Sequence, residues 1–86
     1  MYTELSPATI EQVMDYMQRF APEERLQRMQ MLAELYLAEA DTVGKITADM
    51  LLDKAFFLFD FIQTEGHTFS LDIQQKMSAI QSRRKP

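Results

Sequence analysis

The sequence predicts an all-α protein, a compact arrangement of four helices joined by short loops. Its 86 residues are enough for one domain, residues 1–86, and 47% of them are hydrophobic, as is ordinary for a globular chain. Glycine occurs twice and proline three times, at intervals that divide the chain into four segments. None of these segments alternates polar and apolar residues with the period of two that indicates a half-exposed strand. The sequence therefore predicts helices and no sheet.

The first helix is expected over about residues 7–20. Ser6 suits the N-cap, and Pro7 suits the first helical position, where its missing N–H costs nothing. Leu5 and Ile10 occupy the two positions of a hydrophobic staple around this start. Polar residues cover one side of the helix and apolar residues the other, which predicts a single buried face. That face consists of Ile10, Val13, Met14, Met17 and Phe20.

The second helix is expected over about residues 22–43. It begins at Pro22, and Glu23 and Glu24 follow in the first turn, where the helix dipole favours negative charge. Gly44 suits the position after its end. The apolar residues form two stripes, so this helix is expected to contact something on two sides. The main stripe consists of Leu26, Met29, Leu32, Ala33, Tyr36, Leu37 and Ala40, and the second consists of Met31, Leu35 and Ala38.

The sequence leaves open what covers the second stripe of this helix. The stripe could lie against the C-terminal helix of the same molecule, form a seam between two copies, or line a groove for a helix of a partner. Met31 stands out among the methionines because its flexible side chain would suit such a surface. Four other methionines are expected to fill gaps in the core, namely Met14, Met17, Met29 and Met50.

The third helix is expected over about residues 48–65 and contains the stretch LLDKAFFLFDFIQ, which is rich in phenylalanine and leucine. Thr47 suits its N-cap, Ile46 and Leu51 form a staple, and Gly66 follows its end. A narrow polar strip runs along it, and nearly every other position is apolar. This pattern predicts a central helix that shows only the strip to water. The strip consists of Asp49, Asp53, Asp60 and Thr64.

The fourth helix is expected over about residues 70–83, with a narrow apolar stripe. Its C-terminus carries positive charge, which the helix dipole favours at that end. The stripe consists of Ile73, Met77 and Ile80, and the basic residues are Arg83, Arg84 and Lys85.

No motif for catalysis, a cofactor or a metal appears in the chain. Cysteine is absent, and the single histidine, His67, is expected in a loop, so metal sites and nucleophilic triads lack their residues. The aspartate strip lacks the spacing of a calcium loop and is interpreted as a solvated face. If it binds anything, a Lys/Arg-rich segment is the chemistry it would suit. We therefore expect a protein that is not an enzyme and holds no cofactor or metal.

A second interpretation is a DNA-associated transcriptional regulator. The stretch LAEADTVGKITADMLLDKAF has the short glycine-containing turn of a helix-turn-helix unit, and the basic tail, Arg83, Arg84 and Lys85, could touch phosphates. The net charge of −4 argues against nucleic acid as the main partner. The second helix of such a unit would also present Asp49 and Asp53 rather than basic or amide side chains.

The sequence also favours a cytoplasmic protein. The start MYTELSPATI lacks the basic and apolar regions of a secretion signal, and a chain without cysteine suits a reducing compartment. The apolar run from Leu51 is interrupted by charges and falls short of the roughly 20 apolar residues that span a bilayer.

The expected function is that of a small acidic protein-binding module, an adaptor, chaperone or inhibitor, acting as a homodimer. Four short helices around one core need one apolar stripe each, and the second and third helices offer more. The partner would be another protein, such as one that offers a helical segment, or a second copy of the chain. The expected contact residues are Met31, Leu35, Ala38, Phe56, Phe57 and Phe61.

Overall fold

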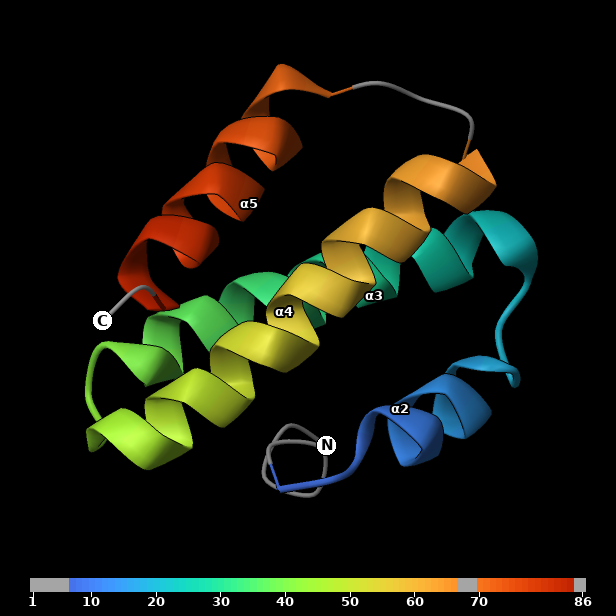
Figure 1. Cartoon of the computed structure of the whole chain (residues 1–86). Coiled ribbons are helices and arrows are strands. Elements are labelled where there is room, and N and C mark those ends of the chain that lie inside the picture. The colour runs from blue at the N-terminus through green and yellow to red at the C-terminus, as the bar shows by residue number, and fades with distance from the viewer. Residues whose placement is uncertain (1–6, 67–69, 85–86) are drawn as a thin grey trace.

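The computed structural model describes residues 7–66 and 70–84, and every regular element within them is an α-helix, which confirms the all-α prediction. The longest helix, α4, lies in the middle of the molecule, with α3 packed along it and α5 on another side, while α2 lies near the opposite end from α5 (Figure 1). This arrangement confirms that the third helix expected from the sequence is the central one. The helices are α2 (Ile10–Met17), α3 (Pro22–Ala40), α4 (Lys45–Gly66) and α5 (Leu71–Arg84).

The core is continuous and draws on all four helices. Tyr36 of α3, Phe59 of α4 and Met17 of α2 are among its largest fully buried side chains. The expected apolar stripe of α5 is buried as well, through Ile73, Met77 and Ile80. Within the described residues no polar or charged residue is classed as buried, so apolar packing dominates the interior.

The start of α2 differs from the expected one at Pro7. Thr9 is the N-cap, its hydroxyl oxygen accepting a hydrogen bond from the Gln12 N–H at 3.2 Å. The Gln12 side-chain oxygen in turn accepts from the Thr9 N–H at 2.9 Å. This reciprocal capping box satisfies two backbone donors, which a start at Pro7 would not do. The expected cap and staple residues Ser6 and Leu5 lie outside the described residues.

The C-terminal end of α2 is held by a side chain of α3. Arg25 donates from Nε to the Met17 carbonyl at 3.1 Å and from Nη2 to the Phe20 carbonyl at 3.0 Å. Carbonyls at a helix end lack partners within the helix and carry the negative end of its dipole. A guanidinium is therefore a favourable partner, and Arg25 joins α2 to α3 where little else connects them.

The turn between α3 and α4 also differs from the expected one. Helix α3 ends at Ala40, and α4 begins at Lys45 rather than near residue 48. The carbonyl of Gly44 accepts the N–H of Ala48 at 2.8 Å, so Gly44 holds the N-cap place that was expected for Thr47. The expected staple is absent too, because Ile46 is 81% exposed.

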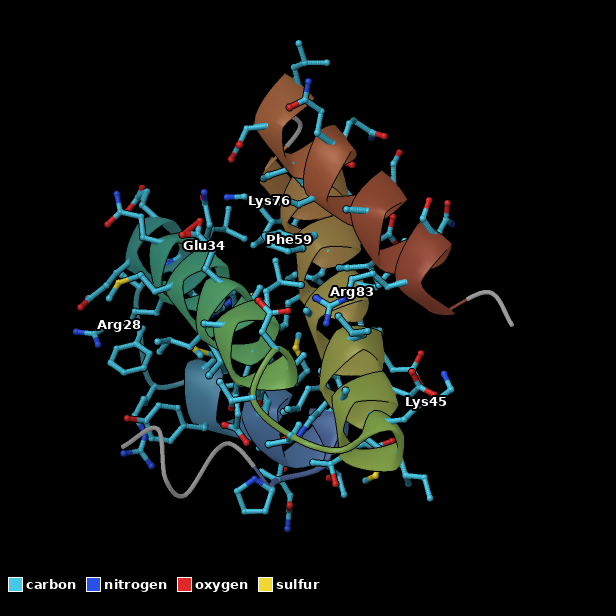
Figure 2. All side chains as sticks on the ribbon, turned by 90° about the vertical axis from the view of Figure 1, so that its left-hand side faces the viewer. Arg28, Glu34, Lys45, Phe59, Lys76 and Arg83 are labelled. Atoms are coloured by element: carbon cyan, nitrogen blue, oxygen red, sulfur yellow. The ribbon has the colours of Figure 1, made fainter. Side chains whose placement is uncertain are left out.

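Two ion pairs join α5 to α3. The Nζ atom of Lys76 lies 3.0 Å from Oε2 of Glu34, and Nη2 of Arg83 lies 2.9 Å from Oδ1 of Asp41. Arg83 comes seven residues after Lys76 on α5, and Asp41, at the end of α3, comes seven residues after Glu34. The matching spacing means that α5 runs parallel to α3. Figure 2 shows Lys76 between the two helices, above Phe59, whose ring centroid is 5.9 Å from Nζ. Lys76 also pairs with Asp72 of its own helix at 2.9 Å.

Lys76 gives the fold a dependence on alkaline pH. Lys76 donates hydrogen bonds to Asp72 and Glu34, and these raise its pKa above the ordinary value of 10.5, the bond to Asp72 having the largest effect. Burial acts in the opposite direction. Because the raised pKa belongs to the folded state, the stabilisation is complete below about pH 10.5 and is lost as the pH rises through the raised pKa. Lys76→Met should remove up to about 1 kcal/mol at neutral pH, since the pair is partly exposed.

The measurement is the free energy of unfolding by urea at about pH 8 and about pH 11, for the wild type and Lys76→Met. The difference between the two proteins should shrink at the higher pH. An equal difference at both values would contradict an ionic role for Lys76.

Candidate protein-binding surfaces

The second apolar stripe of α3 lies on the outside of the molecule. Met31 is 65% exposed and Leu35 is 41% exposed, and Ala38 beside them is exposed. We call these three residues the α3 outer face. They lie on the opposite side of the helix from its buried residues, so α5 does not cover them as one interpretation of the sequence allowed.

The three expected phenylalanines point in different directions. Phe56 is half-buried on the side of α4 that carries Gln63, whose side-chain oxygen accepts a hydrogen bond from Gln74 of α5 at 2.9 Å. Phe61 is half-buried and lines a small cavity with Pro22 at the start of α3. Phe57 alone is exposed, at 44%.

Phe57 and the α3 outer face do not form one surface, contrary to the expectation from the sequence. Buried residues of α3 and α4 face each other across the core. Leu35 and Phe57 each lie on the far side of their own helix from those residues. The two exposed surfaces therefore point away from each other.

A longer exposed surface runs along α4. Its apolar members are Ile46, Met50 and Phe57, which are 81%, 60% and 44% exposed, and two aspartates and a threonine lie between and beyond them. The expected thin polar strip is thus wider than predicted, and Met50 is not a core residue. We call this surface the α4 outer seam, made of Ile46, Met50, Asp53, Phe57, Asp60 and Thr64.

An open groove of about 580 Å³ adjoins the N-terminal half of the α4 outer seam. Met50 and Asp53 of the seam line one side of it, and the segment before α2 lines another, through Pro7, Ala8 and Ile10. Five of the ten residues that line it are apolar, and most of the surface that the lining exposes to the groove is apolar. A groove with this lining suits an apolar side chain or small apolar group.

Lys54 crosses from α4 to the segment before α2 at the edge of this groove. Its Nζ donates to the Ala8 carbonyl at 3.0 Å and lies 4.7 Å from the centroid of the Tyr36 ring. Burial lowers the pKa of Lys54 below its ordinary value, and the nearby charge of Glu39 opposes this shift. These contacts give Lys54 a structural role, because they fix one wall of the groove.

The basic tail is only partly within the described structure. Arg83 forms the ion pair with Asp41 and so helps to hold α5 in place. Lys85, the side chain of Arg84 and His67, which was expected in a loop, lie outside the described residues. Across residues 7–66 and 70–84, no three His, Cys, Asp or Glu residues are grouped as metal ligands would be.

Within the same ranges, no helix combines the length and the apolar character needed to cross a membrane. Comparison of the chain with protein-family models, with curated proteins and with solved structures finds no match in any of the three.

Proposed function

We propose that this chain is a non-enzymatic protein-binding module, an adaptor, chaperone or inhibitor, that pairs with a second copy through the α3 outer face. The observation that carries the proposal is the exposure of Met31 and Leu35, one turn apart on a helix whose opposite side is fully buried. A partner that covers such side chains removes their apolar area from water, which stabilises the complex by about 25 cal/mol for each Å² buried.

The charges around the α3 outer face favour a second copy as the occupant. When two α3 helices pack antiparallel about a two-fold axis, Met31 of one copy lies near Leu35 of the other. The small Ala38 allows the two helices to approach closely. Arg28 and Glu39 lie on one flank of α3, eleven residues apart, so the same pairing brings each Arg28 toward the other copy's Glu39. Arg28 is on the outer side of α3 in Figure 2, where it pairs with Glu24 at 2.8 Å and its Cζ lies 4.2 Å from the centroid of the Phe20 ring. A partly exposed ion pair of this kind contributes little, so the guanidinium can be shared with a second carboxylate.

DNA binding is less well supported than protein binding. Of the basic tail, the side chain of Arg83 is already paired with Asp41. A helix-turn-helix unit would place the exposed side of α4 in the major groove of DNA, and that side presents Asp53 and Asp60. Phosphates would be repelled by these carboxylates.

Leu35→Asp is expected to abolish pairing and leave the helices intact. A two-fold pairing would bury both copies of the new carboxylate without a partner, whereas in the single chain the side chain meets water. The molar mass should be measured by light scattering during size-exclusion chromatography. We expect twice the 10.1 kDa chain mass for the wild type and a single chain mass for the variant.

The matched control is Leu71→Asp, which makes the same change at a 65%-exposed leucine on α5. This variant should assemble like the wild type. A wild type that stays monomeric at every concentration would refute the pairing. Loss of the circular dichroism signal in Leu35→Asp would instead show that Leu35 supports the fold.

A further inference from the structure

The α4 outer seam has the spacing of a helix–helix contact. Its six residues lie four, three, four, three and four positions apart, from Ile46 to Thr64. This is the repeat by which one helix presents a continuous row of side chains to another. At 1.5 Å per residue the row is about 27 Å long, enough for a partner helix of several turns.

The seam alternates apolar and acidic side chains, which defines the chemistry of its occupant. Met50 and Phe57 flank Asp53, and Asp60 follows one turn later. No described residue forms an ion pair or hydrogen bond with Asp60. A matching helix would place apolar side chains against Ile46, Met50 and Phe57 and a cation near each aspartate.

A second copy does not fit the seam. In a parallel pairing, Asp53 and Asp60 would each face the same residue of the other copy, so like charges would meet. In the antiparallel register that matches the whole seam, Asp53 would face Phe57 and Asp60 would face Met50, so carboxylates would lie against apolar side chains. The pattern thus disfavours self-association through α4.

We propose that the α4 outer seam docks an amphipathic helix of another protein that carries Lys or Arg opposite Asp53 and Asp60. The groove of about 580 Å³ beside Met50 receives one large apolar side chain of that helix as an anchor. The seam and the α3 outer face point in opposite directions, so this docking goes beyond the proposed pairing, although both would involve Glu39, which lines the groove.

The test uses three fluorescein-labelled synthetic peptides of about three heptads. The first carries leucine at the positions facing the apolar residues of the seam and lysine at those facing the aspartates. In the second, glutamate replaces each lysine. The third scrambles the first, so that it keeps the composition and charge but not the amphipathic pattern. Fluorescence anisotropy against the full chain gives each Kd.

The lysine peptide should bind at least about tenfold more tightly than either of the others, because it alone supplies both the apolar face and the complementary charge. Asp60→Lys should weaken the lysine peptide and strengthen the glutamate peptide. Ile46→Ser should weaken it as well, and because Ile46 is 81% exposed this change should not disturb the fold.

Two control variants separate this proposal from the pairing of α3. Leu35→Asp should remove pairing and retain peptide binding, and Leu71→Ser should change neither. Equal binding of the lysine peptide and its scrambled form would overturn the proposal, because charge alone would then explain the binding. Binding that survives both Asp60→Lys and Ile46→Ser would also overturn it, by placing the peptide elsewhere on the chain.

Discussion

Phe59→Ala is expected to destabilise the fold by about 3–5 kcal/mol, a larger loss than a substitution at an exposed position would cause. Phe59 is fully buried on α4, between α3 and α5, and its ring lies under Lys76. Truncation removes the ring from the centre of the core and leaves a cavity that four packed helices cannot fill. Small domains have only about 5–15 kcal/mol of stability, so this is a large share of the total.

Phe57 provides a matched control two residues away on the same helix. It is 44% exposed, so Phe57→Ala should cost far less than Phe59→Ala. Thermal unfolding followed by circular dichroism, at one fixed protein concentration, should show a Tm fall of more than about 12 °C for Phe59→Ala. Similar falls for both variants would mean that the assigned faces of α4 are wrong.

Arg25→Met is expected to release α2 from the rest of the molecule. The substitution keeps most of the apolar stem but removes both hydrogen bonds to the carbonyls of Met17 and Phe20. Hydrogen bonds that involve a charged group contribute about 1.5–3 kcal/mol each in net terms. After the substitution the Met17 carbonyl would keep only its bond from the Phe20 N–H at 3.2 Å. Because α2 has few other contacts with α3, the loss should fall mainly on α2.

Native-state hydrogen exchange is the measurement that separates local from global opening. Amides of α2 should exchange about tenfold faster or more in Arg25→Met, while those at the centre of α4 change less. Arg25→Lys should have an intermediate effect, because an ammonium group cannot donate to both carbonyls in the geometry of the guanidinium. Equal acceleration in every helix would show that Arg25 stabilises the whole fold rather than the end of α2.

The helices and their buried faces could be predicted because a buried helix face leaves a periodic pattern of apolar residues along its whole length. Val13 and Met17 of α2, Tyr36 of α3 and Ile80 of α5 all lie in the core where the pattern placed them. Such a face is defined by several side chains at once, so no single residue decides it.

Helix ends were predicted less well because each depends on a choice between two adequate local signals. Ser6 and Thr9 both suit an N-cap, and Gln12 decides in favour of Thr9 by completing the capping box. Thr47 and Gly44 compete in the same way at the start of α4, where the backbone bond of Ala48 goes to Gly44. The role of Arg25 at the end of α2 could not be foreseen, because its hydrogen bonds to the Met17 and Phe20 carbonyls depend on how α2 and α3 are arranged in space.

The exposure of Met31 and Leu35 was predictable only in part, because the sequence showed a second stripe but left open whether the C-terminal helix of the same molecule covers it. Ile46 was missed because it was assigned to a hydrophobic staple, and Met50 was missed because it was assigned to the core. Their spacing from Asp53 and Asp60 carried the missing signal. A residue three or four positions from an exposed aspartate shares its face, even when the residue is apolar.

The opposite orientation of the α3 outer face and the α4 outer seam bears on how the protein would engage a target. Two chains joined through α3 would carry their seams on the two far sides of the pair. A target with two basic helices could then bind both chains, and the second contact would form at the effective concentration set by the linker between those helices. Avidity of this kind can exceed the affinity of either contact by about 10²- to 10⁴-fold, so the pair could hold a bivalent target tightly while releasing a single helix readily.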